Sequence, residues 1–339
     1  MAVGTTFAAL NTSAPGSVAS PRLWVIAVVV LLILLAVDIA LTRRPHEVGM
    51  REAVGWSVFY LVLPVAFGGY LWGAFGGTAA AEFFTGYVVE KSLSVDNLFV
   101  FMLLLAAFAV PAELTQRVLL YGIIGALVLR AVFIALGAAA LQTGTWVFLL
   151  FGAVLVVTAA KVFKQARAGD EHKIDIHQMR SVRLLRRIVP VTPDYRGFRL
   201  AVREHGRLAL TPLALATVAV FATDIVFAVD SVPAVYGVTE DPFLVFTTNA
   251  FALLGLRALY FVLKGALDKL RHLDYGLAVI LAFIGVKLVL HWAHGIWPAV
   301  PEIPTLASLG VIIAVLTTVT LTSLYANRRT APEPADALD

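Results

Sequence analysis

The sequence contains no cysteine, which excludes disulfides, thiolate metal sites and cysteine nucleophiles. Charged residues are also scarce: they make up 14% of the chain, against about 25% in a typical soluble domain. Hydrophobic residues make up 60% of its 339 positions, and windows of about 20 apolar residues, long enough to cross a bilayer, recur along it. The composition therefore predicts an all-α polytopic membrane protein.

Nine apolar segments are expected to span the membrane. They are 23–41, 54–72, 79–106, 118–141, 146–163, 209–236, 243–263, 275–292 and 306–325. The predicted organisation is a flexible extracytoplasmic tail (1–21), two N-terminal helices (22–78), a three-helix unit (79–163), a basic cytoplasmic loop (164–208), a second three-helix unit (209–292), a last helix (293–325) and a cytoplasmic tail (326–339).

Basic residues are distributed very unevenly among the connections. Twenty of the 26 Lys and Arg residues fall in alternate connections and the C-terminal tail, eleven of them between 164 and 208. Lys and Arg collect on the cytoplasmic side of membrane proteins. We therefore expect a protein of the cytoplasmic membrane with its N-terminus outside and its C-terminus in the cytoplasm.

Two pairs of carboxylates interrupt the apolar segments at matching positions. Glu90 and Asp96 lie in the third segment, and Asp224 and Asp230 in the sixth. A carboxylate at the depth of the hydrocarbon core costs at least ~2.5 kcal/mol, so such residues usually have a function.

The match extends into an internal repeat. Arg130 in the fourth segment corresponds to Arg257 in the seventh, and Lys161 in the fifth to Lys287 in the eighth. Because each unit has three spans, the two units must insert in opposite orientations. Inverted repeats with a midplane site are the architecture of many secondary transporters. The alternative is a chance similarity between apolar segments.

The four carboxylates predict a metal site built from oxygen ligands. Their polar neighbours are Asn97, Ser231 and Asn249, together with Ser92, Ser94, Thr247 and Thr248. Such ligands suit Mg²⁺, Ca²⁺ or Mn²⁺, and Na⁺ or protons are also compatible. Pro233 is expected to break the sixth segment and free a backbone carbonyl for the ion.

Arg130 and Arg257 are expected to balance the charge of the empty site. The alternative is that these arginines and Lys91 pair with the carboxylates for packing alone. Asp38 is expected at the interface, as are His291 and His294, and Glu82 is a candidate for an entry vestibule. No nucleophile with its base, phosphate-binding loop or nucleic-acid module is visible, so we expect neither an enzyme nor a bound cofactor.

Two long motifs resemble the signatures of the TerC family of integral membrane proteins. The first is Glu90-Lys-Ser-Leu-Ser-Val-Asp96-Asn97 with its flanks from Phe84 to Phe101. The second is Thr223-Asp-Ile-Val-Phe-Ala-Val-Asp230-Ser-Val-Pro-Ala234, followed by the segments 241–249 and 254–261. The resemblance covers residues 23–325 and implies a tellurium-resistance-associated membrane protein, with Mn²⁺ exporters among its relatives. It also implies that Glu90, Asp96, Asp224 and Asp230 are the functional acids.

These observations together predict an exporter of divalent cations, Mn²⁺ foremost, that works by alternating access. Its expected partners are the lipid bilayer, the metal ion and membrane or secretory proteins, with no nucleic acid. One alternative is a non-transporting scaffold or stress-resistance component that acts through the cytoplasmic loop. Another is an exporter of a different substrate that uses protons on these acids.

Overall fold

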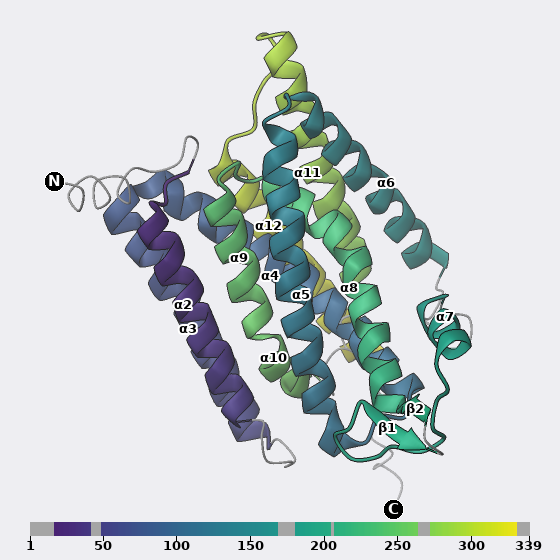
Figure 1. The fold of residues 1–339 in the computed structure, drawn as a ribbon. Helices are drawn as coiled ribbons and strands as arrows, with labels where there is room; N and C mark the ends of the chain where they lie inside the picture. The colour runs from purple at the N-terminus through teal and green to yellow at the C-terminus, as the bar shows by residue number, and fades with distance from the viewer. Residues whose placement is uncertain (1–16, 42–48, 169–179, 205–206, 264–271, 331–339) are drawn as a thin grey trace, which may run out of the picture.

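The structure is a computed structural model that describes residues 17–41, 49–168, 180–204, 207–263 and 272–330. Its helices are α2 (Pro21–Leu41), α3 (Met50–Phe75), α4 (Gly77–Ala107), α5 (Ala112–Leu141), α6 (Trp146–Ala168), α7 (Arg180–Ile188), α8 (Pro212–Tyr236), α9 (Pro242–Leu254), α10 (Leu256–Leu263), α11 (Leu273–Ile296) and α12 (Thr305–Thr330). Two short strands, β1 (Ala201–Glu204) and β2 (Arg207–Leu210), form an antiparallel hairpin at one end of the helical bundle (Figure 1).

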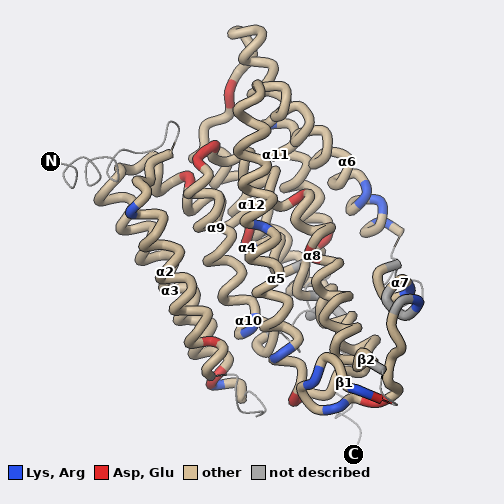
Figure 2. Tube along the Cα trace, viewed as in Figure 1, with Lys and Arg blue, Asp and Glu red and all other residues tan. Residues whose placement is uncertain are grey.

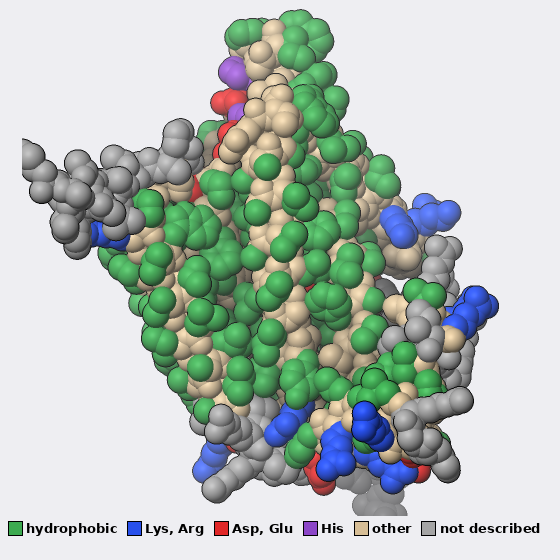
Figure 3. Space-filling view, in the orientation of Figure 1, with side chains coloured by type: hydrophobic (Ala, Val, Ile, Leu, Met, Phe, Trp, Pro, Cys, Tyr) green, Lys and Arg blue, Asp and Glu red, His purple; other side chains and the backbone are tan. Residues whose placement is uncertain are grey.

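The protein is an all-α polytopic membrane protein, as predicted. Among the described helices, eight passes are long and apolar enough to cross a membrane, with α9 and α10 forming one of them. The remaining long helix, α4, is 31 residues long but carries Glu82, Glu90, Lys91 and Asp96. Apolar side chains cover the face of the bundle seen in Figure 3. The count of nine spans stays a prediction.

Lys and Arg residues gather at the end of the bundle that holds the hairpin (Figure 2). The predicted polar loop 164–208 begins inside α6 and also contains α7, β1 and part of β2, so it is more ordered than the sequence indicated. Several of the basic connections, at 42–48, 169–179 and 264–271, lie outside the described residues.

The two predicted three-helix units pack on each other through three pairs of helices. α4 packs on α9, α5 packs on α8, and α6 packs on α11. A two-fold exchange of the units 79–163 and 209–292 would produce this pattern. The α6–α11 crossing depends on two glycines, since a Cβ at Gly152 would lie 2.8 Å from the carbonyl oxygen of Gly285. Such close backbone approach is typical of helix packing in membranes.

Local sequence fixes where the central helices begin. The Thr211 side chain caps α8 by accepting a hydrogen bond from the Ala214 N–H, and Asp241 caps α9 through the Phe243 N–H. Proline follows each cap at the first helical position, where its missing N–H costs nothing. Of the described spans, α9–α10 is the most enclosed, with 78% of its most apolar 18-residue stretch buried, whereas the corresponding stretch of α2 at the periphery is 11% buried.

The predicted break at Pro233 is wrong. α8 continues through this residue to Tyr236. Pro233 removes only one backbone hydrogen bond, and the turn around it is held by packing, including a 2.7 Å hydrogen bond from the Tyr236 hydroxyl to the Ile134 carbonyl. The break lies instead at Gly255, which separates α9 from α10.

Candidate functional site

Arg130 on α5 joins residues from both three-helix units in the interior of the bundle. Its guanidinium forms an ion pair with Glu90 on α4 and lies 3.6 Å from the Asp224 carboxylate on α8. It also donates a 2.9 Å hydrogen bond to the side-chain oxygen of Asn249 on α9. We call Glu90, Arg130, Asp224 and Asn249 the Arg130 cluster. All four residues are buried, with Arg130 only 1% exposed.

The hydrogen bonding of the Arg130 cluster is incomplete. Among the described atoms, Glu90 Oε2, Asp224 Oδ2 and two of the three Arg130 nitrogens have no hydrogen-bond partner, nor does the buried Ser231 Oγ. Two carboxylates and one guanidinium leave a formal charge of −1. Buried polar groups are normally satisfied, because a half-satisfied network in a low dielectric is costly. Carboxylate oxygens with free lone pairs are therefore available to a cation at this point.

The second acid of each predicted pair lies outside this cluster. Asp230 is partly exposed, six residues beyond Asp224 on α8, and it interacts electrostatically with Arg130. The side chain of Asp96 is not among those that the structure describes. In the described part of the chain, no three His, Cys, Asp or Glu side chains are grouped so that they could hold a metal ion.

The flanking hydroxyls are largely engaged by their own helices. Thr247 and Thr248 donate to backbone carbonyls three or four residues earlier, as does Ser92. Ser94 Oγ lies 3.4 Å from Glu90 Oε1 and is the hydroxyl that reaches the Arg130 cluster. Asn97 is buried on α4, two turns beyond Glu90.

Arg257 lies in a different cluster from the one predicted. It pairs with Asp38 on α2 and faces Gln116 on α5, while the Tyr60 hydroxyl donates a 3.3 Å hydrogen bond to Asp38. Asp38 is buried against other helices, and its expected position at the membrane interface stays a prediction. The break at Gly255 lies two residues before Arg257, whereas Arg130 lies within the unbroken helix α5.

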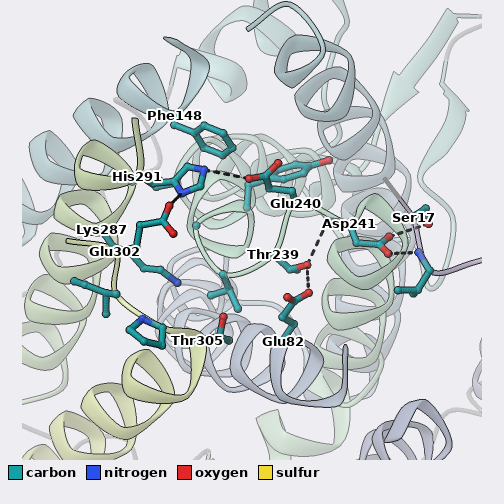
Figure 4. A pocket seen from close by; sticks show the side chains of 17 residues that line it. Ser17, Glu82, Phe148, Thr239, Glu240, Asp241, Lys287, His291, Glu302 and Thr305 are labelled. Carbon is teal, nitrogen blue, oxygen red and sulfur yellow. Dashed lines mark hydrogen bonds and ion pairs between the residues drawn. The ribbon is translucent and has the colours of Figure 1, made fainter. Parts of the chain in front are cut away.

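A cavity of about 910 Å³ opens at the end of the bundle opposite the hairpin. Its polar wall is formed by Glu82, Thr239, Glu240, Lys287, His291 and Glu302 (Figure 4). Glu82, the candidate vestibule residue, lines it and accepts a 2.7 Å hydrogen bond from Thr239.

The two histidines near this cavity do not act together. His291 lies between Glu240 and Glu302, at 3.2 and 2.9 Å, whereas His294 contacts the Val300 carbonyl. The sequence reasoning missed Glu240 and Glu302, although both lie in short connections on the side that lacks basic residues.

Comparison with known proteins places the whole chain among membrane proteins. It is 40% identical to an uncharacterized membrane protein of Myxococcus xanthus, over 95% of this chain and 98% of that protein. It is 39% identical to a protein of Escherichia coli K12 named as a membrane-bound redox modulator, Alx, over 92% and 97% of the two chains. A relative of the same name in Photorhabdus laumondii is 40% identical over 94% of this chain and 99% of its own length.

No solved structure matches the chain. The model of the integral membrane protein TerC family matches residues 75–331, which include every helix of the Arg130 cluster. With this match and with relatives at about 40% identity along almost the whole chain, the protein belongs to the TerC family.

Proposed function

We propose that the protein is a transporter of the cytoplasmic membrane that exports divalent metal cations, with Mn²⁺ as its cargo. The observation that carries this proposal is the Arg130 cluster, in which one guanidinium holds a carboxylate from each three-helix unit. Ionisable residues within membrane spans commonly mark ion pathways. Oxygen ligands without cysteine favour hard cations such as Mn²⁺ over Cu⁺.

The charges suit a carrier that must move both empty and loaded. The Arg130 cluster has a formal charge of −1 as it stands, and a divalent cation would bring it to +1. The two states then have the same magnitude of buried charge, so neither has a much larger desolvation penalty. In this mechanism Arg130 holds Glu90 and Asp224 together and moves aside when the cation binds.

The remaining ligands would come from side chains near the cluster. Glu90 and Asp224 supply carboxylate oxygens, and Asn249 and Ser231 can add neutral ones. Asp96 and Asp230 lie along the same two helices toward opposite ends, so we assign them to the paths by which the ion arrives and leaves. The cavity lined by Glu82 is the proposed outer end of that path.

Alternating access would follow from the two units acting as inverted repeats, with the N-terminus outside and the C-terminus in the cytoplasm. The loop 164–208 is then cytoplasmic, and its basic residues face anionic headgroups. The exchange of equivalent helices between the units supports this arrangement.

The redox role in the name of the relatives is compatible with metal export. This chain has no cysteine, so its own thiols cannot carry electrons or exchange disulfides. A carrier that changes the amount of a redox-active metal such as Mn²⁺ would alter the redox state of a compartment indirectly.

Flux measurements on purified protein in liposomes test the proposal. Wild-type protein should move Mn²⁺ across the bilayer, and Glu90→Gln and Asp224→Asn should each lower the flux at least about tenfold. Glu204→Gln, in the hairpin, is the matched control and should transport normally. If the wild-type protein neither binds nor transports metal, the proposal would be contradicted and a non-transporting membrane component would be favoured.

A further inference from the structure

Lys91 is a half-buried cation within a predicted membrane-spanning helix, and it lies outside the Arg130 cluster. It follows Glu90 directly on α4, and successive residues on a helix point about 100° apart. Its ammonium donates a 3.2 Å hydrogen bond to the carbonyl of Ala252 near the end of α9. Within the described residues this is its only polar contact, and no carboxylate pairs with it. An unbalanced charge in a membrane span is costly, so this position calls for a counter-charge.

A separate cavity of about 190 Å³ adjoins this ammonium. Ser57 on α3, Tyr87 on α4 and the Gly255 break line it together with Lys91. Tyr87 is only 6% exposed, yet its hydroxyl has no hydrogen-bond partner among the described atoms, and neither does Ser57 Oγ. The cavity therefore presents three polar groups that can donate hydrogen bonds. We call it the Lys91 cavity.

The break in α9–α10 brings the ammonium to this place. A Cβ at Gly255 would lie 3.1 Å from Lys91 Nζ and 3.0 Å from Tyr60 Cβ, so glycine leaves room for the lysine to approach. The end of α9 offers a carbonyl that the interrupted helix has freed, and Lys91 binds it. An ammonium has three N–H donors, so two remain for the cavity.

We propose that the Lys91 cavity binds a monovalent anion. Lys91 excludes cations, and a single ammonium among apolar walls cannot balance a multiply charged anion. The rest of the lining is apolar: Val54, Val58, Leu61, Leu259 and Val262. The anion can therefore be a dissolved halide, or the carboxylate head of a membrane amphiphile whose tail lies along α3 and α10.

The proposed anion site is independent of metal transport. The ionisable groups on the helices around it are Arg51, Glu52, Tyr60 and Tyr70 on α3, Glu82, Tyr87, Glu90 and Asp96 on α4, and Arg257 and Tyr260 on α10. Glu90 is engaged by Arg130, and Arg257 by Asp38. Glu52, in the first turn of α3, also interacts with another group and is not without a partner.

Thermal unfolding of the full-length protein in detergent tests the site. In one arm sodium gluconate, a carboxylate whose polyhydroxyl chain cannot lie along the apolar walls of the cavity, is replaced by sodium bromide at constant ionic strength. In the other, sodium laurate is added to the gluconate buffer. The wild-type Tm should rise by about 2–4 °C in at least one arm, because a ligand that binds only the folded state stabilises it. A rise with bromide identifies a halide, and a rise with laurate alone identifies a membrane carboxylate.

Variants make the test specific. Lys91→Met should abolish the rise, and Tyr87→Phe, which keeps the ring and the charge of the site, should reduce it. Lys161→Met removes an exposed lysine on α6 and should respond as wild type does. If neither anion raises the wild-type Tm, or if the rise persists in Lys91→Met, the anion site is wrong. If Lys91→Met does not fold, an unchanged rise in Tyr87→Phe would equally overturn it.

Discussion

Arg257 on α10 pairs with Asp38 on α2, a residue 219 positions earlier in the sequence. Both side chains are buried, and the Tyr60 hydroxyl also binds Asp38. This pair ties the peripheral helix α2 to the most enclosed span of the bundle. It also gives Arg257 a different partner from Arg130, the arginine that the predicted repeat aligns with it.

Removal of one partner of this pair should destabilise the protein. Asp38→Asn or Arg257→Gln leaves a buried charge without its counter-charge, which typically costs about 3–5 kcal/mol. The double variant should recover more than half of the loss, and thermal unfolding in detergent measures each. Equal stability of the single variants and the wild type would contradict the pairing. Mn²⁺ flux should persist in the double variant, because Arg257 lies outside the Arg130 cluster.

Arg130→Gln should slow the return of the empty carrier. Without the guanidinium, Glu90 and Asp224 leave two uncompensated charges in the membrane interior, a penalty of about 3 kcal/mol or more and hence a slowing of at least about 100-fold. Net Mn²⁺ efflux should fall by that factor, whereas Mn²⁺/Mn²⁺ exchange, which uses only the loaded form, should fall much less. Arg130→Lys, which keeps the positive charge, should show a net efflux between that of the wild type and that of Arg130→Gln. Equal losses of efflux and exchange would contradict this role.

Gly152→Ala should weaken the α6–α11 crossing. The added Cβ would lie 2.8 Å from the Gly285 oxygen and 2.8 Å from a methyl group of Val289, so the helices must move apart. Overpacking of this kind costs about 1–3 kcal/mol. Gly69→Ala on α3 is the control, since nothing lies within 4 Å of its added Cβ, and alanine favours the helix. Thermal unfolding should rank Gly152→Ala below wild type and Gly69→Ala at or above it.

Tyr195 should attach the segment before the hairpin to the end of α4 in a pH-dependent way. Its hydroxyl donates a 2.8 Å hydrogen bond to the Phe108 carbonyl, and burial raises the pKa of Tyr195 above its ordinary value. The folded state then holds this proton more tightly than the unfolded state does. Its contribution is complete below about pH 10 and is lost as pH rises through the folded pKa.

Tyr195→Phe tests this attachment by hydrogen exchange around residues 191–199. At neutral pH the variant should exchange faster than wild type, by about fivefold for a hydrogen bond worth ~1 kcal/mol. The difference should shrink at strongly alkaline pH. A difference that stays constant with pH would show that the hydroxyl proton is not involved.

The sequence was most informative where an ionisable residue lies in an otherwise apolar segment. Carboxylates in apolar segments indicated Glu90 and Asp224, and the structure joins both to Arg130, which repeat matching had also selected. The all-α membrane fold followed from composition alone. The partners of Arg257 could not be predicted in this way, because pairing between distant segments leaves no local pattern.

Helix breaks were predicted poorly for a related reason. Pro233 lacks an N–H, yet its neighbours pack well enough to keep α8 continuous. Gly255 carries no comparable signal, and its importance lies in the closeness of Tyr60 and Lys91, which only the three-dimensional arrangement reveals. The metal ligands remain a prediction, and the side chain of Asp96 lies outside the described residues.

The crossing of α6 and α11 limits how such a carrier could move. The helices belong to different units, but at Gly152 and Gly285 their main chains come together without intervening side chains. The two units therefore cannot separate as independent rigid bodies without breaking this backbone contact between α6 and α11. If the protein cycles between inward-open and outward-open states, the α6–α11 contact would act as the pivot, and the remaining helices would tilt around it.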